Sequence, residues 1–201
     1  MGLRLLRLLA ERGDRARGLI RNPDQSQDLA DAGAEPVICD LEQEDDIGPC
    51  VEGADAVVFA AGAGPGSGAE RKRTMDLGGA VKLIDAARKA GIRRYVIVSA
   101  IGADRPEQAS EQMRPYIEAK AEADRRLEES GLDYTIVRPG RLTDEPGTGL
   151  VQAGPTVERG DIPRDDVAGA LAAVLDADNT VGKAFNLVGG ETPIEEAVRA
   201  L

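Results

Sequence analysis

Tyr116 and Lys120 are the residue pair whose types and spacing most directly suggest chemistry. Four residues apart on a predicted helix, they share one face and lie about one turn from each other. A lysine ammonium beside a phenol favours the phenolate, so we expect Lys120 to lower the pKa of Tyr116 from its usual value of about 10. Tyr116 would then act as a general acid or base near neutral pH. A chance pair in a charged helix is the alternative.

Ser99 ends the apolar run 95–99, which is typical of a buried strand. A hydroxyl at that place can donate a hydrogen bond to a substrate carbonyl, or it can bond to its own loop. The order of a strand-end serine, the helix with Tyr116 and Lys120, and Arg138-Pro139-Gly140 after the next strand favours a catalytic set over chance.

The elements that would position these residues alternate between helical patterns and short apolar runs, without repeats or a long linker. This alternation predicts an α/β fold, a doubly wound, Rossmann-like parallel sheet in three αβα layers. We expect one NAD(P)-binding domain over residues 1–201, with a small substrate-side part at about 141–201. Strands are predicted at 17–20, 36–39, 54–60, 95–99, 134–137 and 184–188, and helices at 3–11, 24–32, 45–51, 70–90, 113–130, 165–175 and 193–201.

Candidate cofactor contacts gather at the carboxyl ends of the strands, where such sheets bind ligands. Arg21 follows the strand at 17–20, and an arginine there accommodates the 2′-phosphate of NADP, whereas an acidic residue would bind the ribose of NAD. A solvated turn arginine is the alternative. Asp40 could flank the adenine, cap a helix, or do both. The predicted contacts are Gly2, Arg21, Asn22, Asp40, Leu41, Ala60, Ala61, Gly62, Lys120 and Pro139.

The sequence begins at a helix, whereas a dinucleotide-binding fold opens with an apolar strand and a glycine-rich turn. Gly2 matches the last glycine of GxxGxxG, which permits close packing of helix and strand. We therefore expect an N-terminally truncated sheet whose absent strand would lie between the strands ending at Ile20 and Phe59. An internal methionine taken as the start, another segment or chain in that position, a distorted fold, and a complete protein of another fold remain open.

The composition limits which partners the protein can bind and in which cellular compartment we expect it. A net charge of −11 opposes binding to nucleic acid or anionic lipid, and fits a solvated surface or a salt-adapted source. Without a membrane-helix or signal-peptide pattern, we expect a cytoplasmic protein with a small-molecule substrate and no membrane partner, and homo-oligomerisation stays open. Because the sequence has no histidine and Cys39 and Cys50 lack CxxC spacing, we expect no metal site and two reduced thiols.

These residues resemble the atypical short-chain dehydrogenase/reductase proteins of the NAD(P)H-binding, NmrA-like or epimerase-like group. The resemblance covers nearly the whole chain from Gly2 and is most specific at 19–23, 53–62, 76–81, 116–120 and 131–140. It implies NADP binding through Arg21 and a catalytic set of Ser99, Tyr116 and Lys120. Asp76 matches a position where related enzymes often carry an asparagine that completes a tetrad, and a helix-face carboxylate without a catalytic part is the alternative.

The resemblance implies an NADP-dependent oxidoreductase that exchanges hydride with a carbonyl or alcohol of a small molecule, or an epimerase that works by transient oxidation. NAD is the less favoured cofactor. Tyr116 would transfer the proton, Lys120 would hold the nicotinamide ribose, and Ser99 would polarise the carbonyl. The chain departs from the family in its truncated glycine motif and short C-terminal part. A non-catalytic NAD(P)H sensor with a protein partner and an inactive truncated form are the alternatives.

Overall fold

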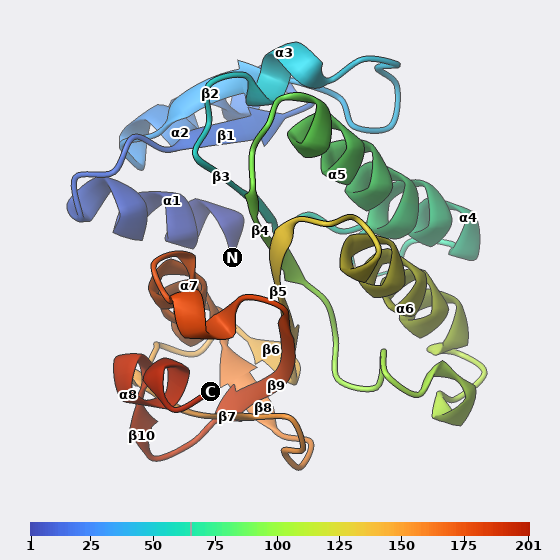
Figure 1. The fold of residues 1–201 in the computed structure, drawn as a ribbon, viewed down its shortest axis with the longest axis vertical. Coiled ribbons are helices and arrows are strands. Elements are labelled where there is room, and N and C mark those ends of the chain that lie inside the picture. The colour runs from blue at the N-terminus through green and yellow to red at the C-terminus, as the bar shows by residue number, and fades with distance from the viewer. Residues whose placement is uncertain (65) are drawn as a thin grey trace.

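The computed structural model describes residues 1–64 and 66–201, in which helices and strands alternate as far as about residue 139 and several short strands then follow one another (Figure 1). No helix within these residues is both long enough and apolar enough to span a membrane. The first half contains α1 (Gly2–Glu11), β1 (Arg17–Ile20), η1 (Pro23–Gln25), α2 (Ser26–Asp31), β2 (Glu35–Ile38), α3 (Gly48–Val51), β3 (Ala56–Phe59), α4 (Ala69–Arg71), the π-helical η2 (Lys72–Gly79), α5 (Ala80–Lys89) and β4 (Arg94–Val98). The second half contains η3 (Pro106–Gln108), α6 (Arg114–Glu128), β5 (Asp133–Pro139), β6 (Arg141–Thr143), β7 (Leu150–Gly154), β8 (Asp161–Pro163), α7 (Arg164–Leu175), η4 (Asp178–Thr180), β9 (Lys183–Gly189), β10 (Thr192–Pro193) and α8 (Ile194–Arg199).

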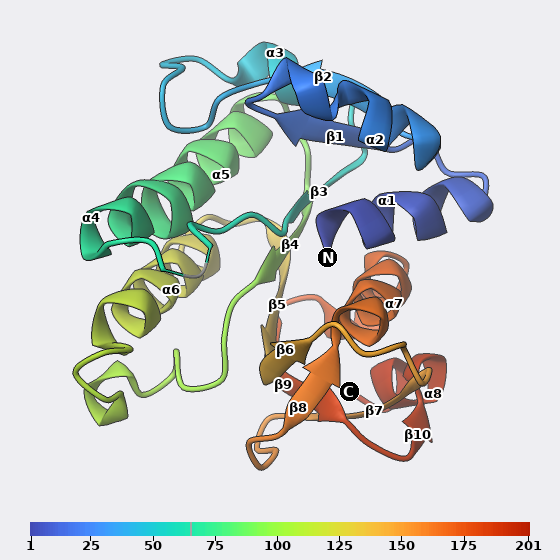
Figure 2. The ribbon, with the colours of Figure 1, turned by 180° about the vertical axis from the view of Figure 1, so that it is seen from behind.

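The main sheet has the strand order β10-β7-β9-β5-β4-β3, and the pairs β1–β2 and β6–β8 form separate small sheets. Strands β3, β4, β5 and β9 run parallel, which confirms the predicted Rossmann-like class. Helices α4, α5 and α6 cover one face, and α1, α7 and α8 cover the other (Figures 1 and 2).

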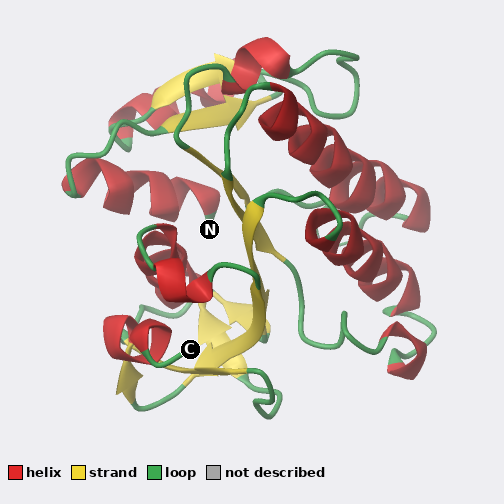
Figure 3. Ribbon diagram, viewed as in Figure 1, coloured by secondary structure: helices red, strands yellow, loops and turns green. Residues whose placement is uncertain are grey.

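The antiparallel strands β7 and β10 at one edge of the sheet were not predicted. We expected a parallel sheet and read residues 143–154 as irregular chain. In β7 only Val151 and Gly154 are buried, and β10 has just two residues, so neither strand carries a strong apolar pattern. Figure 3 shows how short the strands of this region are. Pairing with β9, which is distant in sequence, defines this edge.

Two apolar layers hold the sheet between its helices. Along β4, Tyr95 and Ile97 pack in the layer beneath α5 and α6, whereas Val96 and Val98 pack in the layer that includes α7. This alternation follows from the two-residue period of a strand. The same period decides which polar side chains of the strands face α6.

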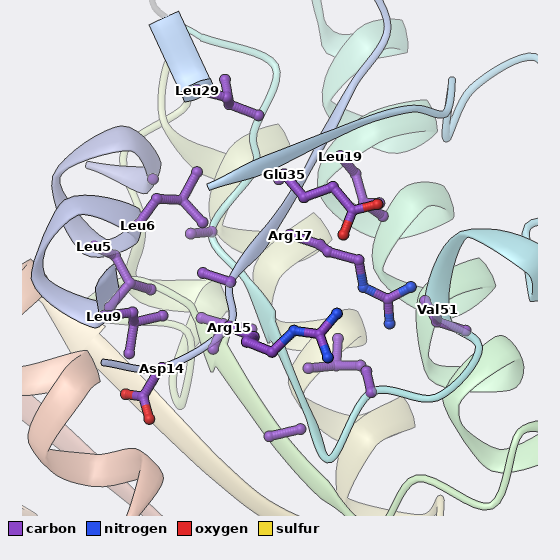
Figure 4. A pocket seen from close by; sticks show the side chains of 18 of the residues that line it. Leu5, Leu6, Leu9, Asp14, Arg15, Arg17, Leu19, Leu29, Glu35 and Val51 are labelled. Carbon is purple, nitrogen blue, oxygen red and sulfur yellow. The ribbon is translucent and has the colours of Figure 1, made fainter. Parts of the chain in front are cut away.

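A cavity of about 1450 Å³ separates β1 from β3, and we call it the strand slot. Among the described residues, β1 pairs only with β2, and β3 pairs only with β4. Leu5, Leu6 and Leu9 of α1 lie on one side of the slot, and Leu19 of β1 lies on the other (Figure 4). The slot occupies the position, between the strands ending at Ile20 and Phe59, where the sequence placed an absent strand. Both flanking strands therefore present unpaired backbone groups there.

Cys39, directly after β2, and Cys50 in α3 form a disulfide, with their Cα atoms 6.4 Å apart. Our expectation of two reduced thiols is therefore wrong, because the turn between β2 and α3 folds back and brings together cysteines 11 residues apart. A carboxylate oxygen of Glu44 lies within 4.8 Å of both sulfurs. Thiolates are the form of cysteine that binds metals, so the disulfide form does not offer these ligands.

Candidate active site

Helix α6 presents Tyr116, Lys120 and Asp124 at intervals of four residues, so the three side chains share one helix face. Lys120 and Asp124 are buried, and Tyr116 is partly buried. The sequence predicted the first two as site residues and missed Asp124. Asp124 could have been found from the sequence, because it continues the four-residue spacing of Tyr116 and Lys120.

Lys120 forms a buried ion pair with Asp76. Its Nζ lies 3.2 Å from Oδ1 of Asp76 and donates a hydrogen bond of 3.0 Å to the carbonyl of Val98. The other oxygen of Asp76 accepts a hydrogen bond of 3.2 Å from the amide of Ala63. Asp76 belongs to the π-helical segment η2, a geometry that is rare in proteins and frequent at functional sites. Asp76 is thus a buried partner of Lys120 and not a solvated helix-face carboxylate.

Gly62 lets the chain pass close to this ion pair. A Cβ placed on Gly62 would lie 3.0 Å from Oδ1 of Asp76, which is tighter than ordinary contact. We predicted Gly62 as a cofactor contact at the end of β3. Its position makes it, in addition, a residue whose small size accommodates the Asp76 carboxylate.

Ser99 and Arg138 converge on a single oxygen of Asp124. The Ser99 hydroxyl donates to Oδ2 of Asp124 at 2.9 Å, and Nε of Arg138 donates to the same oxygen at 3.0 Å. Oδ1 of Asp124 is buried without a hydrogen-bond partner among the described residues. Burial raises the pKa of Asp124 to about 6, although Arg138 and Ser99 act in the opposite direction. Ser99 therefore bonds to Asp124 and not to its own loop.

Burial, followed by the carboxylates of Asp76 and Asp124, raises the pKa of Tyr116 to about 12. Our expectation that Lys120 lowers this pKa is wrong for this arrangement. The Lys120 ammonium lies 5.9 Å from the centre of the Tyr116 ring, and Asp76 balances its charge. Tyr116 is therefore a neutral phenol at neutral pH and a potential proton donor.

The predicted adenine-side residues lie at the ends of β1 and β2, where each has an intramolecular partner. Arg21 pairs with Oε2 of Glu42 at 3.3 Å, with half of its side chain exposed. Oδ1 of Asn22 accepts from the amide of Asp24 at 3.1 Å and caps η1. Oδ1 of Asp40 accepts from the amide of Glu42 at 2.9 Å, so Asp40 caps a turn. Leu41, which follows, is buried in the core beneath α5.

The remaining predicted cofactor contacts lie at the start of α1, at the end of β3 and at the end of β5. Helix α1 has no acidic residue in its first turn and no side-chain cap, so its first amides are open to an anion such as a pyrophosphate. Gly2, Ala60 and Ala61 line the slot. A Cβ placed on Gly2 would meet nothing within 4 Å, so the close helix–strand contact that we expected there is not made. Pro139 is buried, and its carbonyl accepts from the amide of Ile101 at 3.2 Å.

The strand slot and the catalytic cluster are different places. The slot has a volume of about 1450 Å³. Of the predicted site residues, only Gly2, Leu41, Ala60 and Ala61 line it. The cluster of Ser99, Tyr116 and Lys120 is defined instead by its buried charges and hydrogen bonds.

The parallel sheet with helices on both faces defines a Rossmann-like protein of the NAD(P)-binding class. The sequence profile of the NAD(P)H-binding family matches residues 1–178, so the chain belongs to this family. It is 45 % identical over 203 residues to the uncharacterized sugar epimerase YhfK of Bacillus subtilis (strain 168), covering 100 % of this chain and 95 % of YhfK.

Two solved structures are also similar. A Bacillus halodurans protein, described provisionally as an NAD-dependent epimerase/dehydratase, matches with a TM-score of 0.95 at 41 % identity, covering 99 % of this chain and 94 % of that chain. The oxidoreductase ylbE from Lactococcus lactis matches with a TM-score of 0.87 at 30 % identity, covering 98 % and 90 %.

Proposed function

We propose that this protein is an NADP-dependent reductase that reduces the carbonyl group of a small molecule. The observation that carries the proposal is the buried cluster on α6, where the neutral phenol of Tyr116 stands near the Lys120–Asp76 ion pair. Membership of the NAD(P)H-binding family and the similarity to an oxidoreductase support it.

Three regions of the chain would hold the dinucleotide. The open amides of α1 and Gly2 would bind the pyrophosphate, and Ala60 and Ala61, which line the slot just before Gly62, leave space at the end of β3. Arg21 with Asn22 would bind the 2′-phosphate, with Asp40 and Leu41 beside the adenine. Lys120 and Pro139 would lie at the nicotinamide end.

The residues of the cluster divide the chemistry between them. Bound NADPH supplies the hydride for the carbonyl carbon. Tyr116 gives its hydroxyl proton to the carbonyl oxygen, so the carbonyl becomes an alcohol, and solvent then returns a proton to the phenolate. Lys120 stabilises that phenolate by its positive charge. Ser99 donates to the carbonyl oxygen when Asp124 is protonated, because its hydrogen is otherwise directed to the carboxylate.

The raised pKa of Tyr116 favours reduction over epimerisation. An epimerase that works by transient oxidation must first take a proton from an alcohol, which needs the phenolate, and burial beside two carboxylates leaves little of Tyr116 in that form. A phenol with a pKa of about 12 still donates readily to the more basic alkoxide that hydride addition creates.

The test is turnover of NADPH against a panel of small aldehydes and ketones. Tyr116→Phe should lower turnover by roughly 10²–10⁴, the usual contribution of general acid catalysis, and leave the Kd for NADPH nearly unchanged. Tyr134→Phe, a change in the other partly buried tyrosine on β5, is the matched control and should keep full turnover. Unchanged turnover in Tyr116→Phe would refute the mechanism. Binding of NADPH without turnover of any substrate would favour a sensor, and exchange of stereochemistry without net oxidation of NADPH would favour an epimerase.

A further inference from the structure

A second cavity, of about 330 Å³, begins two residues after Ser99. Its polar lining consists of Arg105, Gln108, Arg159 and Asn186, and we call it the arginine pocket. None of its described lining residues is acidic. This is notable in a sequence with 36 acidic and 25 basic residues.

Arg159 is held at the pocket without an ion-pair partner among the described residues. Its Nη2 atom lies 3.0 Å from the place that a Cβ on Gly102 would occupy, and Gly102 has a φ of +99°, so glycine both permits the turn and makes room for the guanidinium. Arg105 is also exposed and pairs with its neighbour Asp104 at 3.1 Å. The pocket therefore offers at least one guanidinium whose charge is free for a ligand.

Asn186 supplies a buried amide to the same pocket, with only 7 % of the residue exposed. Its strand neighbours Phe185 and Leu187 pack in the layer that includes α7, so Asn186 faces the opposite side, in register with Arg138. Its side-chain amide forms no hydrogen bond with the described part of the chain and is not among the fully buried unpartnered polar atoms. The amide is therefore accessible from the pocket and available to a ligand there.

The backbone fixes the pocket relative to the catalytic serine. The amide of Ser99 donates to the carbonyl of Val137 at 2.8 Å, and the amide of Ile101 donates to the carbonyl of Pro139 at 3.2 Å. The segment from Ser99 to the pocket wall is thus tied to β5. A group bound in the pocket would be held at a constant place relative to the Ser99 hydroxyl.

We infer that the arginine pocket binds an anionic group of the substrate, a carboxylate or a phosphate, and so selects small carbonyl compounds that carry such a group. This inference rests on the proposed reductase function. Guanidinium groups pair with both anions through two parallel hydrogen bonds, and an amide N–H adds a neutral donor.

Direct binding tests the pocket without any catalysis. Inorganic phosphate and succinate are titrated separately into the protein while the side-chain N–H signals of Arg159 and Asn186 are followed by NMR. We expect these signals to shift with saturation. Arg159→Gln and Asn186→Leu should each weaken binding roughly tenfold or more, as expected for the loss of a charge-assisted or buried hydrogen bond. The probe with the lower Kd shows whether the pocket prefers a phosphate or a carboxylate.

Arg88→Gln is the matched control, because Arg88 is an exposed arginine on α5 that pairs with Asp85 at 3.8 Å. It should bind both probes as the unchanged protein does. Equal binding by all variants, or no shift of the Arg159 signal, would overturn the inference. A thermal unfolding transition of Asn186→Leu tests whether this variant is folded. Arg159→Gln changes an exposed loop residue and so tests anion binding independently of the buried substitution.

Kinetics separate this inference from the proposed function. For a carbonyl substrate with a carboxylate, Arg159→Gln should raise KM roughly tenfold and leave kcat unchanged, whereas KM for the neutral methyl ester should not change. Turnover of acid and ester with equal KM would reject the pocket and keep the reductase. Anion binding that depends on Arg159, with no turnover of any carbonyl, would keep the pocket and reject the reductase.

Discussion

The hydroxyl of Ser99 donates a hydrogen bond of 2.9 Å to the carboxylate of Asp124, across 25 residues of sequence and inside the protein. The same carboxylate oxygen holds Arg138, which is itself mostly buried. Asp124 is thus a positioning residue, because it orients Ser99 and balances a buried guanidinium. Its protonation state decides whether the Ser99 hydrogen is available to a ligand.

Asp124→Asn should change the dependence of stability on pH. The pKa of Asp124 is raised from 3.8 to about 6 in the folded protein, so the folded state binds the proton more tightly than the unfolded state. Protonation of Asp124 therefore adds to the free energy of unfolding at low pH. This contribution, roughly 3 kcal/mol at about 1.4 kcal/mol per pKa unit, is lost as pH rises from about 4 to about 6. Denaturant unfolding of both proteins between pH 4 and pH 7 measures the difference. Asp85→Asn, an exposed change on α5, is the control, and equal slopes for all three proteins would contradict the prediction.

Breaking the Lys120–Asp76 ion pair should be strongly destabilising. Asp76→Asn leaves the buried Lys120 ammonium without its counter-charge, and the loss of one partner of a buried pair costs about 3–5 kcal/mol. The double variant Asp76→Asn, Lys120→Met should recover part of that loss, since neither charge remains. Urea unfolding of the single and double variants measures the coupling. Additive losses would show that the two side chains do not interact.

Arg21→Ala should weaken NADP selectively. Arg21 is the exposed cation at the end of β1, and removal of one charge-assisted interaction with a phosphate should raise the Kd for NADP roughly 10- to 100-fold and leave the Kd for NAD nearly unchanged. Glu42→Gln should lower the Kd for NADP, because it removes the carboxylate that forms an ion pair with the Arg21 guanidinium. Calorimetric titration of both cofactors measures the ratio. Equal weakening of NADP and NAD would show that Arg21 does not contact the 2′-phosphate.

Filling the strand slot should stabilise the protein. We expect an apolar strand and a Gly-x-x-Gly turn, joined ahead of Met1, to pair with the open edges of β1 and β3. A net gain of a few kcal/mol would raise Tm by roughly 5–15 °C for a chain of this size and tighten NADP binding. Thermal shift with NADP and with NAD compares the two forms. A matched extension with aspartates at the apolar positions should give no gain, and an equal gain from both would exclude strand pairing.

The sequence could predict elements whose signal is local. Residues 17–20 were predicted as a strand and form β1, because the apolar pair Leu19-Ile20 directly before the turn Arg21-Asn22-Pro23 is a local signal. Asp76 entered the predicted catalytic set only through the resemblance to a known family, and in the structure it pairs with Lys120.

Features that depend on burial and distant partners were not predictable. The pKa of Tyr116 is raised first by burial of the phenol and then by the carboxylate of Asp76, which lies 40 residues earlier in the sequence. Asp124 acquires its role only when Ser99 and Arg138 arrive from two different strands. Strand β7, which lies between the edge strand β10 and β9, exists because β9 pairs with it, and its own residues carry little apolar pattern.

The strand slot also interrupts cooperativity within the sheet. No backbone ladder among the described residues connects the β1–β2 pair with the six-stranded sheet, so the two parts are coupled through helix packing and loops alone. A domain whose halves share no ladder can open in two steps, and amides bordering the gap will exchange with solvent before those at the centre of β4 and β5. A single unfolding midpoint would then average two distinct stabilities, one for each side of the gap.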